Sequence, residues 1–244
     1  MPMRNSTQKN RIARRLAILV CLSAACSSQA FAGPHEDACA VGAGERAIAA
    51  CSEVIGIGEG PELAWAYFNR ARAYFNAKLY ASAILDLGEV LRYRKNDTDV
   101  LENRALAYEA IGDYGRAIDD FDTLVDLQPQ VAIWVRERCW ARAATGKDLD
   151  DAMDDCNRAL TLSPRDAAAR DARCFVQVRS GAYAAAIADC TAALAVNPKL
   201  ASSLYVRGLA KRKTGDATAD ADIASAKSLA PEIADTYADL GVRP

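Results

Sequence analysis

Histidine and cysteine offer the widest range of side-chain chemistry, and this sequence supplies them unequally. His35 is the only histidine among 244 residues, whereas cysteine occurs eight times. The chain therefore lacks HExxH, and it also lacks the Ser-His-Asp and Cys-His arrangements that general base chemistry commonly needs. We predict that the protein is not an enzyme.

Two other patterns resemble ligand-binding motifs but fit them poorly. Gly56, Gly58 and Gly60 are spaced like part of a phosphate loop, yet no strand precedes them and Pro61 then begins a helix, so we interpret them as a linker. A group of aspartates lies at Asp148, Asp150, Asp151, Asp154 and Asp155. This group lacks the glycine and the distal glutamate of a calcium loop, and acidic residues are favoured at a helix start anyway. With no CxxC present, we expect no metal and no cofactor.

Arginine and aspartate recur in step along the chain. The arginines are Arg70, Arg104, Arg138, Arg173 and Arg207, and the aspartates are Asp86, Asp120, Asp155, Asp189 and Asp222. Five free arginines would form a cationic ladder for an acidic ligand. Because the two series match in number and spacing, we favour structural ion pairs, in which each arginine pairs with an aspartate of its own or the adjoining segment.

The first 32 residues have the features of a cleaved secretory signal. The basic start holds Arg4, Lys9, Arg11, Arg14 and Arg15 without an acidic residue. An apolar run over 16–25 follows, and small residues at Ala30 and Ala32 predict cleavage before Gly33. The apolar run is shorter than the roughly 20 residues that span a bilayer, and no later run approaches that length. We therefore expect no membrane span.

Two other kinds of signal remain open. Arg14 and Arg15 are compatible with a twin-arginine signal, although the residues after the pair fit it poorly. Cys26 is compatible with a lipidated cysteine, although Ser23 stands where such signals usually have leucine. In each case the mature protein is expected in the periplasm or outside the cell.

Removal of the signal changes the charge and the cysteine count. The formal charge of −2 loses five positive groups, which leaves −7 and argues against nucleic acid or an anionic membrane as partner. Six of the eight cysteines remain. An even number in an oxidising compartment predicts a set of disulfides, for which fifteen connectivities exist.

An internal repeat of about 34 residues organises the rest of the chain. Similar helical stretches begin near Ala83, Ala117, Ala152, Ala186 and Ala219. Glycines that suit a left-handed helix end precede them at Gly112, Gly146, Gly181 and Gly215, and prolines that stop the following helix are Pro129, Pro164, Pro198 and Pro231. A repeat of this length indicates stacked units with a shared core.

This pattern resembles the tetratricopeptide repeat (TPR) family, in which each repeat is a pair of antiparallel helices. With the alanines above as position 20, the small residues of position 8 are Ala71, Ala105, Cys139, Cys174 and Gly208. The first full repeat departs from the pattern, with Lys78 in place of the glycine and Lys95 in place of the proline. The chain is thus similar to exported bacterial TPR proteins.

The resemblance implies an all-α, right-handed solenoid of antiparallel helix pairs. We expect a cleaved signal over 1–32, a shortened leading half repeat and linker over 33–63, five repeats over 64–231, and a capping helix and tail over 232–244. The end helices are needed because one helix pair cannot bury its apolar face alone.

The repeat numbering also suggests how the cysteines pair. Cys139 and Cys156 fall at positions 8 and 24 of one repeat, and Cys174 and Cys190 fall at the same positions of the next. Those positions face each other across a TPR helix pair. Cys51 then has Cys39 as its natural partner, whereas a bond between Cys156 and Cys174 is the serious rival.

In TPR proteins, ligands usually lie against the first helices, on the concave face. The matching positions of this chain include Trp65, Phe68, Arg72, Arg136, Trp140, Phe175, Arg179 and Arg212. We expect Trp140 and Phe175 to be at least partly exposed there and to capture an extended acidic or apolar peptide. The carboxylate clamp of chaperone-binding TPR domains is absent at the matching positions.

The sequence therefore predicts a non-catalytic scaffold that binds a protein or peptide, as a monomer or with weak self-association. A structural subunit of an envelope or secretion assembly is the alternative. An enzyme that used carboxylates alone would need a closed pocket, which a rod of open repeats does not promise.

Overall fold

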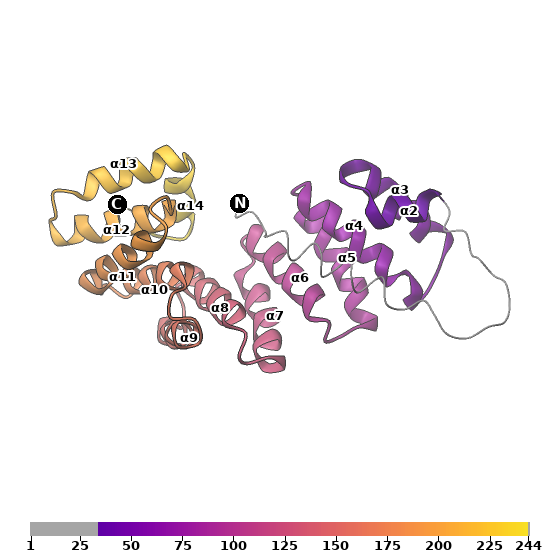
Figure 1. Ribbon diagram of the computed structural model, residues 1–244, viewed down its shortest axis with the longest axis horizontal. Coiled ribbons are helices and arrows are strands. Elements are labelled where there is room, and N and C mark those ends of the chain that lie inside the picture. Colours follow the sequence, from indigo (N-terminus) through magenta and orange to yellow (C-terminus); the bar gives the residue numbers. More distant parts are fainter. Residues whose placement is uncertain (1–33, 244) are drawn as a thin grey trace. The chain divides into compact units, whose positions relative to one another are not determined.

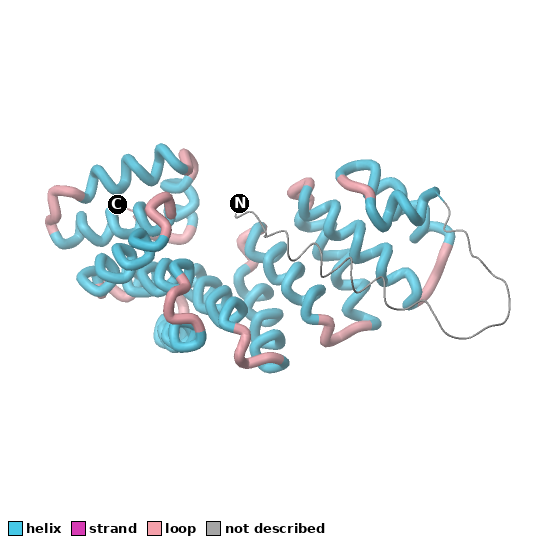
Figure 2. The backbone as a smooth tube through the Cα atoms, in the orientation of Figure 1, coloured by secondary structure: helices cyan, strands magenta, loops and turns pink. Residues whose placement is uncertain are grey.

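The structure is a computed structural model that describes residues 34–243. The expected signal peptide, with its cleavage site before Gly33, lies outside the described residues. Over the described range the chain forms thirteen α-helices and one short 3₁₀ turn, without any strand. The prediction of an all-helical fold is confirmed (Figures 1 and 2).

Ten of the helices form five consecutive pairs. The pairs are α4 (Ala64–Asn76) with α5 (Tyr80–Tyr93), α6 (Thr98–Ala110) with α7 (Tyr114–Leu127), α8 (Ala132–Thr145) with α9 (Leu149–Leu162), α10 (Ala167–Arg179) with α11 (Tyr183–Val196), and α12 (Ala201–Thr214) with α13 (Ala219–Leu229). Each helix packs against the next one along the chain (Figure 1). Helix-pair stacking therefore supplies the core, as expected.

Shorter helices lie before and after these pairs. The leading unit contains α2 (Pro34–Val41) and α3 (Gly44–Ile57), followed by the 3₁₀ turn Pro61–Leu63, and the chain ends with α14 (Ile233–Asp239). The leading unit is thus a complete, short helix pair, whereas the sequence predicted only half of one. The eight residues of α2 give too few turns for the repeat pattern to be recognised from the sequence.

Small residues at position 8 let the two helices of a pair approach closely. Ala71, Ala105 and Cys139 are all buried at these points. At Gly208, a Cβ atom would lie 3.0 Å from the backbone oxygen of Ala219 and 2.6 Å from the side chain of Ile223. Only glycine leaves room for α13 at this distance from α12, because helix backbones cannot shift as a flexible side chain can.

The turn within each pair requires a left-handed residue. Gly112 and Gly146 have φ values of 77° and 68°, and Lys78 adopts φ 63° at the same place in the first pair. A lysine is less suited than glycine to this conformation. The departure seen in the sequence therefore changes the residue but leaves the turn intact.

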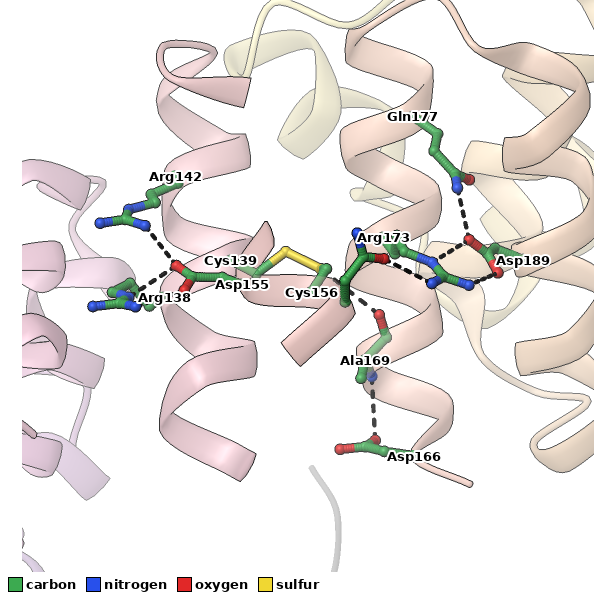
Figure 3. The surroundings of a disulfide bond; sticks show 11 residues. Arg138, Cys139, Arg142, Asp155, Cys156, Asp166, Ala169, Arg173, Gln177 and Asp189 are labelled. Atoms are coloured by element: carbon green, nitrogen blue, oxygen red, sulfur yellow. Dashed lines mark hydrogen bonds and ion pairs between the residues drawn. A yellow bond between two sulfur atoms is a disulfide. The ribbon is translucent and has the colours of Figure 1, made fainter. Parts of the chain in front are cut away.

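Three disulfides close three of the helix pairs. They join Cys39 to Cys51, Cys139 to Cys156, and Cys174 to Cys190, with Cα atoms 4.7, 5.4 and 5.5 Å apart. These are the pairs inferred from the repeat positions, and the rival bond between Cys156 and Cys174 is not formed. Figure 3 shows Cys139 and Cys156 linked between α8 and α9. By restricting the unfolded chain, each bond contributes on the order of 3 kcal/mol.

Each of the five arginines forms an ion pair with the aspartate of its own repeat. The hydrogen bonds run from Nε and Nη2 of the arginine to the two carboxylate oxygens, at 2.6–2.8 Å. All five aspartates are buried. A buried carboxylate is stabilised only when its charge is matched and its oxygens are hydrogen-bonded, and the planar guanidinium does both.

Further polar side chains reinforce these pairs in the later repeats. Arg142 donates to Asp155 at 2.7 Å beside Arg138, as Figure 3 shows. Gln177 donates to Asp189 at 2.8 Å, and Lys211 lies 2.9 Å from Asp222. These residues add further bonds to the buried aspartate of their own helix pair.

Removal of one arginine from the series should destabilise the fold strongly. We expect Arg104→Ala to lower the free energy of unfolding by about 3 kcal/mol, because it leaves the Asp120 carboxylate buried without its partner. Chemical denaturation followed by circular dichroism measures the change. Arg116→Ala is the matched control, because the pair of Arg116 with Asp113 is exposed and should contribute below about 1 kcal/mol.

A double variant separates charge burial from packing. Arg104→Met with Asp120→Leu removes both charges together, so it should recover a large part of the stability lost in Arg104→Ala. Equal stability of Arg104→Ala and the unmodified protein would contradict a structural role for the series.

Candidate partner-binding groove

The first helices of the second, third and fourth pairs line an open hollow. Its walls come from α6, α8 and α10, and its volume is about 250 Å³. The lining residues are Glu109, Arg136, Glu137, Trp140, Ala168, Asp171 and Ala172. We call this hollow the central groove. It contains two of the residues expected to bind a partner, Arg136 and Trp140.

Trp140 provides a half-buried aromatic surface in the central groove. Its ring packs edge-on against the Tyr114 ring, with centroids 5.5 Å apart and an interplanar angle of 69°. The ring therefore has a fixed orientation while one part of it remains accessible. Rigid, partly exposed aromatic side chains are favourable anchors for a partner because they bury a large area at a small entropic cost.

Arg136 is already engaged by carboxylates. It donates to Glu137 on the same helix and to Asp166 Oδ2 at 3.0 Å. The two carboxylates raise the pKa of Arg136 against the opposing effect of desolvation, the largest single influence. Its charge is thus balanced within the protein, and it is not a free cationic site for an acidic ligand.

Glu109 is an acid of the groove whose environment strongly changes its ionisation. Burial, with a smaller contribution from Glu137, raises its pKa to about 9, although Arg136 acts in the opposite direction. Its Oε1 atom is buried without a hydrogen-bond partner among the described residues. The side chain is therefore protonated and neutral at pH 7, so it can donate one hydrogen bond as well as accept.

Asp171 joins the floor of the groove to the next pair. Its carboxylate accepts hydrogen bonds from Ser202 Oγ at 2.7 Å and from Ser203 Oγ, both on α12. Burial raises the pKa of Asp171, while the two hydroxyl groups oppose the shift. These bonds fix α10 against α12 on the side that faces the groove.

Phe175 and Arg179 require a correction. The sequence placed Phe175 beside Trp140 on an open surface, but the residue is only 1% exposed, and its ring packs edge-on against Tyr237 of α14 with centroids 5.2 Å apart. Arg179 donates to the backbone oxygen of Leu240 just after α14. The final helix lies over this part of the expected surface, and the sequence showed that such a helix exists but not where it lies.

The remaining predicted groove residues lie away from the central groove. Trp65 and Phe68 on α4 are half-buried, where Trp65 packs against the leading unit and Phe68 against the core of the first pairs. Arg72 is exposed. Arg212 is exposed and bonded to Asp220 at 2.8 Å. None of the four lines the central groove.

The acidic residues of the groove were not predicted from the sequence. Glu109 and Asp171 occupy positions 12 and 5 of their repeats, which are among the positions expected to face a ligand. The groove residues predicted from the sequence were aromatic or basic, although the same positions also carry these two acids. Their burial, which sets their chemistry, depends on neighbouring helices. Among residues 35–243 no group of side chains is arranged to hold a metal ion.

The raised pKa of Glu109 predicts a pH-dependent cost to stability. The folded state binds a proton at Glu109 between about pH 4.5 and about pH 9, where the unfolded chain has released it, so stability falls as pH rises through this range. Glu109→Gln keeps the shape without the ionisation. We expect it to raise the thermal midpoint by about 3 °C or more at pH 8, with the difference shrinking toward pH 5.

Scanning calorimetry at several pH values measures this difference. The exposed Glu59 offers the control Glu59→Gln, which should leave the midpoint unchanged. A difference that is constant across pH would contradict the assignment of the shift to Glu109.

Comparisons with known proteins agree with this architecture. A family model described as "Tetratricopeptide repeat" matches residues 102–167, and a search of curated proteins found no match. Among solved structures, a TPR protein from Parabacteroides merdae has a TM-score of 0.66 at 17% identity, with 80% of each chain covered.

Two further solved structures have the same fold. MamA from Desulfovibrio magneticus RS-1 has a TM-score of 0.58 at 20% identity and covers 68% of this chain and 94% of its own. A thermophilic TPR protein from Thermus thermophilus has a TM-score of 0.58 at 20% identity, with 73% and 97% covered. The family match is confined to residues 102–167, and the helix pairs around it share the fold of these TPR structures.

Proposed function

We propose that this protein is a non-catalytic scaffold that binds a protein or peptide partner on its concave face, in the central groove. The observation that carries the proposal is the groove itself, in which a fixed aromatic ring and several hydrogen-bonding side chains from three different helix pairs line one open hollow. The TPR fold is consistent with such a role, because its stacked first helices form an extended surface for a partner.

The groove chemistry favours a partner that offers apolar surface and hydrogen-bond donors. Trp140 supplies the apolar contact, while Glu137 and the neutral Glu109 supply acceptor oxygens. Because Arg136 is neutralised by Glu137 and Asp166, an acidic segment gains less here than the sequence suggested. An extended peptide with exposed backbone N–H groups and an apolar or basic side chain fits these groups better.

Location in the periplasm or outside the cell is part of the proposal. Three disulfides are compatible with an oxidising compartment. No helix of the described part is long and apolar enough to cross a membrane. The basic and apolar start of the sequence supports export.

Photocrosslinking from the groove tests the proposal. A photoreactive amino acid replaces Ala168, which is exposed and lines the groove, or Leu85, which is 73% exposed on the second helix α5. We expect a crosslinked partner in intact cells from position 168 and not from position 85. Trp140→Ala in the 168 variant should reduce the yield by about tenfold, equivalent to roughly 1.4 kcal/mol.

A matched variant controls for general damage to the surface. Leu85→Ala removes exposed apolar surface from α5 and should leave the yield from position 168 unchanged. Equal crosslinking from both positions, or a yield that does not respond to Trp140→Ala, would argue against the central groove as the binding site.

A further inference from the structure

Helix α14 covers apolar side chains of α10 and α12. The Tyr237 ring packs between Phe175 of α10 and Tyr205 of α12, with both ring centroids 5.2 Å away. Ile233 and Leu240 are also buried in the same cluster. Three apolar side chains, two from α14 and one from the residue that follows it, thus occupy this surface at a spacing of i, i+4 and i+7.

The helices beneath α14 are joined by contacts in which α14 takes no part. Asp171 of α10 accepts hydrogen bonds from Ser202 and Ser203 of α12. The bond between Cys174 and Cys190 fixes α10 against α11. Departure of α14 would therefore leave a preformed groove floored by Phe175 and Tyr205, and a preformed groove binds a helix at a lower cost in ordering.

Helix α14 is short, and its C-terminal end is capped by backbone hydrogen bonds. It has seven residues and is followed by Gly241 at φ 77°, and Val242 N then donates to Tyr237 O at 2.9 Å. Arg179 donates to Leu240 O at this end, where a cation is favourable. A helix this short is marginal on its own in water, so its helicity depends on these few contacts.

The fit of α14 is incomplete. The Tyr205 hydroxyl is buried beside Tyr237 without a hydrogen-bond partner among the described residues. A hollow of about 330 Å³ remains at the end of α14, between Arg179, Tyr183 and Lys213 on one side and 241–243 on the other. A longer helix could fill this hollow and retain the contacts that α14 makes.

We propose that this face of α10 and α12 is a helix-binding groove and that α14 is its replaceable occupant. A partner helix with apolar side chains at the spacing of Ile233, Tyr237 and Leu240 binds there after α14 leaves. The proposal rests on the proposed function only in taking the partner to be a protein, and it concerns a surface distinct from Trp140 and Ala168. Failure of crosslinking at Ala168 therefore leaves it standing.

A labelled copy of α14 tests whether another helix can take its place in the groove. The probe is a synthetic peptide of residues 230–243 with an N-terminal fluorescein, and fluorescence anisotropy measures its binding to the full chain. Tyr237→Ala in the protein weakens the covering helix and leaves the floor intact. We expect this variant to bind the peptide at least about tenfold more tightly than the unmodified chain, because α14 no longer competes within the molecule.

Matched controls distinguish groove binding from general stickiness. Tyr93→Ala removes an exposed tyrosine from α5 and should bind the peptide as weakly as the unmodified chain. A peptide with Tyr237→Ala should lose most of its affinity for the Tyr237→Ala protein. Phe175→Leu in the Tyr237→Ala protein places a smaller apolar side chain in the floor of the groove. It should weaken binding of the unmodified peptide at least about fivefold.

Three outcomes would overturn the proposal. The first is equal affinity of the peptide for the unmodified chain and the Tyr237→Ala protein. The second is no binding to a Tyr237→Ala protein whose circular dichroism shows the remaining helices intact. The third is a dimer of the unmodified chain in sedimentation that Tyr237→Ala dissociates, since the occupant would then be the α14 of a second copy.

Discussion

Each helix pair of this protein has an apolar face that only another helix can cover, and this requirement governs the rest of the structure. The pairs satisfy it by stacking in sequence order, with small residues such as Ala105 and Gly208 letting the helices approach. Stacking leaves an uncovered face at each end. The leading unit α2–α3 covers one end, where a short helix is stabilised by the bond between Cys39 and Cys51. Helix α14 covers apolar surface at the other end.

The ion pairs stabilise buried charged groups inside each helix pair, and the disulfides link the two helices of a pair covalently. An aspartate buried in each second helix is matched by an arginine of the first helix, so the two helices are held in one register. Disulfides add a covalent link at a neighbouring point in two of the pairs. Together they make the first helices a rigid support, on which a binding surface needs little ordering.

The charge balance of the central groove shows why residue type alone is a poor guide to function. Arg136 looks like a cationic contact in the sequence, but two carboxylates neutralise it. Glu109 looks like an ordinary surface acid, but burial raises its pKa to about 9. The groove is thus not the basic surface that its arginine residue suggested, because the charge of Arg136 is matched and Glu109 is neutral at pH 7.

The sequence by itself determined the helix pairs and the series of arginines and aspartates, because both follow from a period of about 34 residues. The resemblance to TPR repeats implied the pairing of the cysteines, and the structure decided between it and the rival bond from Cys156 to Cys174. Partners such as Arg104 and Asp120 lie in adjacent helices of one repeat, so local spacing places them together. Only the tertiary structure decided the position of α14 and therefore the burial of Phe175. The contact between Phe175 and Tyr237 joins residues 62 positions apart in different repeats, and no periodic pattern specifies how a final, non-repeating helix folds back.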